Sequence, residues 1–100
     1  SYFLTMTDII WGNVTKIISN STFELNVTHQ KEENQETYSE IEIIEFTETD
    51  IMSIPADESS RDITHLEQSL KDKFIRCDIS SRNNQNQLIC KVSHSGAGGY

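Results

Sequence analysis

Short runs in which apolar and polar residues alternate recur along this chain, and they constrain its fold more than any other feature. The clearest run is 22–28, in which Phe23, Leu25 and Val27 share one face and polar residues occupy the other. A period of two residues is typical of a half-buried strand. Four further segments have alternating or β-branched character and are predicted as strands: 14–18, 40–46, 74–79 and 87–92. In 40–46 we expect Ile41 and Ile43 on one side and Glu42 on the other, with a bend before Ile44 and Phe46.

Only residues 59–73 have helical periodicity. Ile63, Leu66 and Leu70 recur at positions i, i+3 and i+7, which places them on one apolar stripe. Ser59 and Asp62, three residues apart, fit a capping box at the start of this helix. The helix therefore stands between the third and fourth predicted strands.

The order β-β-β-α-β-β is that of a five-stranded barrel of the oligonucleotide/oligosaccharide-binding (OB) class, in which the helix closes one end. We therefore predict a mainly β, OB-fold barrel over residues 12–93. Residues 1–11 are apolar without a clear period and are interpreted as an N-terminal arm or strand. Residues 94–100 are predicted to form a flexible Gly-rich tail.

The charge is distributed unevenly over the 100 residues. The net charge is −8, and residues 1–60 alone hold twelve acids against two bases. Between Glu32 and Glu58 there are ten acids and no Lys or Arg. Such a run repels phosphate, so the composition argues against an ordinary nucleic-acid binder. No apolar run approaches the ~20 residues of a membrane span, so no membrane insertion is expected.

Three segments carry a family resemblance. They are G-N-V-T-K-I-I-S-N-S-T-F-E-L (12–25), E-I-I-E-F-T-E-T-D (42–50) and R-N-N-Q-N-Q-L (82–88). In these segments, and in the spacing of the helix and fourth strand, residues 12–92 resemble the staphylococcal nuclease (thermonuclease) family. The corresponding family patterns are G-x-V-x-x-V-x-D-G-D-T-F-x-L, R-L-x-G-I-D-A-P-E and R-D-x-Y-G-R-x-L. The resemblance implies an OB-fold barrel and, in catalytic members, calcium-dependent hydrolysis of phosphodiesters.

The residues that carry this chemistry in the family are replaced here. The aspartate positions hold Ser19, Ser21 and Thr47, the glutamate position holds Asp50, and the two arginine positions hold Glu42 and Gln87. An arginine fork stabilises the charge that develops on the phosphate, whereas Glu42 would repel it. We therefore expect no catalytic residues, no metal and no cofactor.

The leading hypothesis is a catalytically inactive binding module that engages a protein partner, and the acidic run favours a basic one. The expected contact residues are acids of the third strand and its end: Glu42, Glu45, Glu48 and Asp50. The alternative is a degenerate calcium-dependent nuclease or a weak binder of single-stranded nucleic acid. A third interpretation is a structural domain of a longer chain.

Two cysteines lie on the inward faces of the last two predicted strands. Cys77 and Cys90 are interpreted either as buried free thiols or as a cross-strand disulfide, and the sequence leaves both open. The three histidines are scattered, and no catalytic arrangement is predicted from them.

Overall fold

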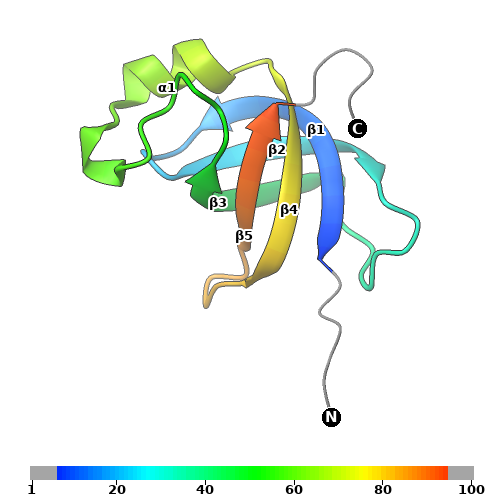
Figure 1. Ribbon diagram of the computed structural model, residues 1–100. Coiled ribbons are helices and arrows are strands. Elements are labelled where there is room, and N and C mark those ends of the chain that lie inside the picture. Colours follow the sequence, from blue (N-terminus) through cyan, green and yellow to red (C-terminus); the bar gives the residue numbers. More distant parts are fainter. Residues whose placement is uncertain (1–6, 95–100) are drawn as a thin grey trace.

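The protein forms a closed β-barrel of five strands with one α-helix across one end (Figure 1). The structure is a computed structural model, and it describes residues 7–94. The strands are β1 (Asp8–Ile17), β2 (Thr22–Gln30), β3 (Ile41–Thr49), β4 (Phe74–Arg82) and β5 (Leu88–His94), and the helix is α1 (Ile63–Leu70). A short 3₁₀ helix, η1 (Glu58–Ser60), precedes α1. The predicted mainly β fold and its element order are confirmed.

The strands follow one another around the barrel in the order β1-β2-β3-β5-β4. All neighbours are antiparallel except β3 and β5, which run parallel. The long strand β1 closes the barrel, because it pairs with β4 over Asp8–Asn13 and with β2 over Ile10–Ile17. The first strand thus begins six residues before the predicted start at Val14. Residues 1–6 of the predicted arm lie outside the described residues, as does 95–100 of the predicted tail.

Gly12 lies where β1 shifts register against β2. A Cβ atom at this position would lie 2.1 Å from the carbonyl oxygen of Asn26, a backbone atom that cannot rotate away. Glycine therefore permits the close approach of the two strands at this bulge.

Alternating side chains of all five strands fill the barrel interior, as Phe23 and Leu25 do with no exposed surface. On β3 the inward residues are Glu42, Ile44 and Phe46, whereas Ile41 is 48% exposed. Ile41 and Ile43 lie on the side opposite Glu42, as predicted. The predicted bend before Ile44 was wrong, because Ile44 and Phe46 continue the inward face that Glu42 begins. The alternation is regular, and a glutamate occupies its first inward position.

The helix is shorter than predicted and has a different cap. Asp62 is the N-cap residue, and its side chain accepts a hydrogen bond from the His65 N–H at 3.1 Å. Ser59 belongs instead to η1, so the predicted capping box was wrong. Leu66 and Leu70 are fully buried, whereas Ile63 at the first helical position is 40% exposed.

The barrel has two different ends. Helix α1, the turn between β1 and β2, and the segment 50–61 cover one end, called here the helix end (Figure 1). The opposite end, called the open end, carries the start of β1, the loop 31–40 and the hairpin between β4 and β5. No helix within residues 7–94 has the length and apolar character needed to cross a membrane.

Candidate functional site

A pocket of about 160 Å³ lies at the open end, between the start of β1, the loop 31–40 and the end of β4. Nine residues line it: Asp8, Gln35, Glu36, Tyr38, Ile79, Ser80, Ser81, Arg82 and Leu88. They combine carboxylates, hydroxyls, an aromatic ring, an arginine and aliphatic side chains. This mixture is suited to a small polar or charged group with an apolar stem.

Asp8 attaches the loop 31–40 to the first strand. Its Oδ1 accepts a hydrogen bond from the Gln35 N–H at 3.0 Å, and its Oδ2 accepts one from the Glu36 N–H at 3.2 Å. The Tyr38 hydroxyl also donates to Oδ2, at 2.5 Å. Burial alone would raise the pKa of Asp8, but these hydrogen bonds and the charge of Lys31 together lower it. Asp8 is therefore held as a carboxylate at neutral pH.

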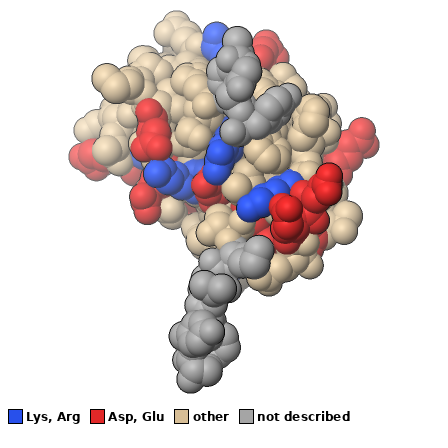
Figure 2. Space-filling model, turned by 45° about the vertical axis from the view of Figure 1, so that its right-hand side comes forward, with Lys and Arg blue, Asp and Glu red and all other residues tan. Residues whose placement is uncertain are grey.

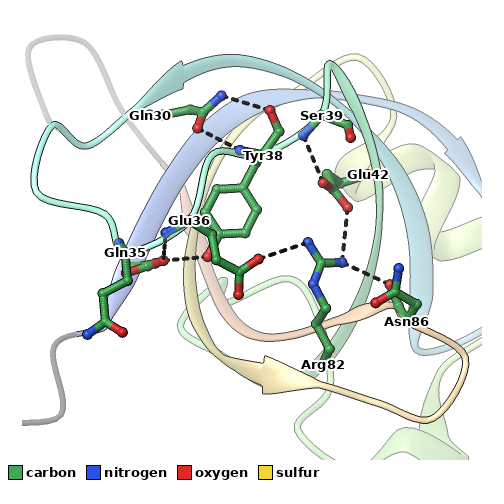
Figure 3. A network of polar contacts seen from close by, with 9 residues as sticks. Gln30, Gln35, Glu36, Tyr38, Ser39, Glu42, Arg82 and Asn86 are labelled. Atoms are coloured by element: carbon green, nitrogen blue, oxygen red, sulfur yellow. Dashed lines mark hydrogen bonds and ion pairs between the residues drawn. The ribbon is translucent and has the colours of Figure 1, made fainter.

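Tyr38 lies inside the open end with only 6% of its surface exposed. The Gln30 side chain holds its backbone twice, accepting from the Tyr38 N–H at 2.9 Å and donating to the Tyr38 carbonyl at 3.0 Å (Figure 3). Burial, together with the hydrogen bond to Asp8, raises the pKa of Tyr38 well above its usual value near 10. Its hydroxyl is therefore a permanent donor to Asp8.

The side chain of Asn34 joins the same loop to β1 with the pair of hydrogen bonds that a neighbouring strand would form. Its Oδ1 accepts from the Ile9 N–H and its Nδ2 donates to the Ile9 carbonyl, both at 2.9 Å. The side chain thus satisfies both backbone groups that β1 presents at this position. Together with the Asp8 contacts, these bonds make the loop a fixed wall of the pocket.

Arg82 at the end of β4 forms the opposite wall. Its Nη1 lies 3.5 Å from Glu42 Oε1, and its Nη2 lies 3.4 Å from Glu36 Oε1 (Figure 3). Nη1 also donates to the Asn86 carbonyl at 2.9 Å, and the guanidinium carbon lies 5.8 Å from the centre of the Tyr38 ring. Burial would lower the pKa of Arg82, but the two glutamates raise it overall. Arg82 therefore stays charged between two acids.

Glu42 is the buried member of this arrangement. Its side chain is 9% exposed, and besides the ion pair with Arg82 its Oε2 accepts from the Ser39 N–H at 2.9 Å. These two partners explain why a glutamate occupies an inward position of β3. A buried carboxylate bound in this way does not reach the protein surface.

The open end carries a negative charge around the pocket. Four exposed glutamates belong to its loop: Glu32, Glu33, Glu36 and Glu40. With the buried acids Asp8 and Glu42, six carboxylates face two bases, Lys31 and Arg82, which leaves a net charge of −4. We call the four exposed glutamates, together with Lys31 and Arg82, the open-end surface.

The structure places the six family positions in different parts of the barrel. Ser19, Ser21, Thr47 and Asp50 lie at the helix end, where the Phe46 N–H donates to the Ser21 carbonyl at 2.9 Å. Asp50 is exposed and pairs with Lys91 at 3.2 Å. Glu42 lies inside the open end, and Gln87 lies in the hairpin next to it, where its Oε1 accepts from Asn83 at 2.8 Å. The six side chains therefore do not form one cluster.

The acidic run is divided in the same way. Glu32 to Glu40 lie at the open end and Asp50 to Glu58 at the helix end, with the nine residues of β3 between them. Of the four acids predicted to contact a partner, Glu42 is buried and Glu45 is half-buried, accepting from Asn83 at 2.9 Å. Glu48 and Asp50 are exposed. On the face shown in Figure 2, acidic and basic side chains lie directly against one another.

Sequence reasoning missed the residues that build the pocket. Asp8 is an acid within an otherwise apolar opening segment, and Tyr38 is an aromatic residue within a polar loop. Both are signals of a long-range polar contact, although neither identifies its partner. Arg82 entered the sequence analysis only as the first residue of the segment 82–88.

Arg61 is a buried arginine that the sequence analysis did not single out. It is 8% exposed, and its three nitrogens donate to the carbonyls of Pro55, Asn20 and Ala56 at 2.7, 3.1 and 3.1 Å. Its guanidinium lies 4.6 Å from the centre of the Phe46 ring. All three hydrogen bonds go to backbone oxygens, so Arg61 fastens the segment 50–61 to the turn between β1 and β2.

Cys77 and Cys90 are free thiols in the barrel interior, each without exposed surface. Hydrogen bonding with Cys77, together with burial, raises the pKa of Cys90. Within residues 7–94, no three His, Cys, Asp or Glu side chains gather closely enough to bind a metal ion.

Comparisons of the chain with protein-family models, curated proteins and solved structures found no match. The closed five-stranded barrel with one helix is consistent with an OB fold.

Proposed function

We propose that this protein is a non-catalytic binding module that engages a basic segment of a protein partner at the open end of its barrel. The observation that carries the proposal is the open-end surface, where four exposed glutamates and two bases surround a pocket and two buried carboxylates add to the negative charge. Complementary charge speeds and orients the encounter of two proteins. A segment rich in Lys and Arg is the complement of this surface.

The open end suits this role better than the acids of β3. Glu42 is buried against Arg82 and Glu45 is bonded to Asn83, so neither presents a free carboxylate to a partner. Glu48 and Asp50 are exposed, but Asp50 is already paired with Lys91. The glutamates of the loop 31–40 are exposed, and the hydrogen bonds of Asp8 and Asn34 hold their backbone in place.

We also propose that the barrel is of the staphylococcal nuclease type and lacks phosphodiesterase activity. Arg82 lies five residues before Gln87, which stands at one of the family's arginine positions. It already pairs with Glu36 and Glu42, so its guanidinium is not free to bind a phosphate. We expect no cleavage of single-stranded DNA with or without calcium. Calcium-stimulated cleavage that is lost in Asp50→Ala would favour a degenerate nuclease instead.

The binding proposal is tested with two charge-reversal triples of equal charge change. One carries Glu32→Lys, Glu33→Lys and Glu40→Lys at the open end. The control carries Glu48→Lys, Glu58→Lys and Glu67→Lys at exposed positions of the helix end. The probe is a twelve-residue peptide with four lysines separated by Gly and Ser, titrated by calorimetry at low and at physiological salt.

We expect the open-end triple to weaken peptide binding at least ~10-fold and the control triple less than ~3-fold. Affinity of the unsubstituted protein should fall as salt rises, because exposed charges are screened. Equal weakening by both triples would show that net charge alone is responsible. That result, or the absence of binding at low salt, would refute the proposal.

A further inference from the structure

The pocket at the open end has the dimensions and chemistry of a site for a single side chain. Resting on the proposed function, we infer that it accepts one lysine side chain of the partner segment. Its volume of about 160 Å³ leaves room for several water-sized groups. A lysine side chain has five non-hydrogen atoms, four methylene carbons and one ammonium nitrogen. The pocket is thus large enough to admit one such chain.

The apolar part of the lining fits the lysine stem. Tyr38, Ile79 and Leu88 contribute an aromatic ring and two aliphatic side chains to the walls. Long cationic side chains bury their methylene groups against apolar surface while the charged end stays among polar groups.

The polar part of the lining fits the ammonium group. Asp8 and Glu36 carry two negative charges into the pocket and Arg82 carries one positive charge, so the lining has a net charge of −1. One monovalent cation neutralises it. The three N–H donors of an ammonium group need three acceptors. The carboxylate oxygens of the lining and the hydroxyl oxygens of Ser80 and Ser81 can supply them.

The same groups disfavour arginine. A guanidinium binds best when a carboxylate offers both oxygens in a planar fork. Glu36 Oε1 is already paired with Arg82 Nη2 at 3.4 Å, and both oxygens of Asp8 accept hydrogen bonds from the loop and from Tyr38. The compact ammonium of lysine needs only single oxygens. The pocket should therefore prefer lysine to arginine.

The test uses the full chain with three small probes and two variants. The probes are the Nα-acetyl, C-methylamide derivatives of lysine, arginine and norleucine, followed by the amide signals of Ser80, Ser81 and Arg82 in NMR titrations. Ser81→Gln places a larger uncharged side chain at the exposed rim of the pocket. The matched control is Thr47→Gln, at an exposed β3 position of the helix end. Both variants are also titrated with the four-lysine peptide and its four-arginine counterpart.

We expect saturable shifts with the lysine derivative, at least ~5-fold weaker binding of the arginine derivative, and no shifts with norleucine. Ser81→Gln should weaken the lysine peptide at least ~5-fold, and Thr47→Gln should leave it unchanged. Equal binding of both peptides with no effect of Ser81→Gln would overturn the lysine site. That result would leave the proposed function standing, provided that the open-end charge triple still weakens binding at least ~10-fold. If no peptide binds the unsubstituted protein, the proposed function and the lysine site both fail.

Discussion

Replacing Asp8 with asparagine tests whether the polar contacts at the open end stabilise the barrel. The variant keeps the size of the side chain but removes its charge and one of its acceptor oxygens. In the native protein both oxygens accept: Oδ1 from Gln35, and Oδ2 from Glu36 and Tyr38. Whichever of the two positions the amide nitrogen of the new asparagine takes, it faces a backbone N–H donor. No orientation of the new side chain satisfies the loop.

The expected loss follows from these contacts. A hydrogen bond to a charged group contributes about 1.5–3 kcal/mol, and a neutral one about 0.5–1.5 kcal/mol. In its better orientation asparagine loses the bond from Gln35 and weakens the other two, while relief of the buried charge offsets part of this. We therefore expect Asp8→Asn to lower the free energy of unfolding by about 2–4 kcal/mol. That is a large fraction of the stability of a domain of this size.

The assay is urea unfolding at pH 7, followed by the fluorescence of Trp11, the single tryptophan. With a slope of ~1.5 kcal/mol per molar urea, the midpoint should fall by roughly 1.5–2.5 M. The control is Asp50→Asn, whose side chain is 63% exposed in a surface ion pair and should change stability by less than ~0.5 kcal/mol. Tyr38→Phe and the double variant complete a cycle in which the two losses should be less than additive. An Asp8→Asn midpoint equal to that of Asp50→Asn would refute the reasoning.

Three further predictions concern backbone packing, the helix end and pH. Gly12→Ala should lower the free energy of unfolding in urea by at least ~3 kcal/mol, because its Cβ would meet the Asn26 carbonyl and one strand must move. Asn13→Ala is the control. A Gly12→Ala variant as stable as the native protein would contradict the close approach of the strands at this bulge. Arg61→Lys should lower the free energy of unfolding by about 2 kcal/mol, measured by thermal unfolding, because lysine cannot reach all three carbonyls. An unchanged melting temperature would show that these hydrogen bonds do not stabilise the protein. The pKa of Asp8 is lowered by folding, so its contribution should be full above about pH 4 and lost as the pH falls through the lower native value. Urea midpoints between pH 2 and 7 should therefore slope less in Asp8→Asn than in the native protein, and identical slopes would contradict this.

The local patterns of the chain were enough to predict most of its elements. Alternation in 22–28 and 74–79 corresponds to β2 and β4, because period two is a property of each strand by itself. The apolar stripe with Leu66 and Leu70 indicated the helix for the same reason. The cap was placed at Ser59 instead of Asp62, because Ser59 and Asp62 have the spacing of a capping box whether or not a helix begins there. In the structure Asp57 caps η1 and Asp62 caps α1.

The candidate site depended on contacts that no local pattern contains. Glu42 is an inward residue only because Arg82, forty positions later, brings a compensating charge to the same end of the barrel. Asp8 and Tyr38, thirty residues apart, meet because β2 pairs with β1 as far as Gln30 and the loop 31–40 then returns across the start of β1. Apolar burial is nearly independent of the partner, so composition and period predict it. A buried charge is stable only beside a particular partner, and the tertiary structure alone brings that partner into place.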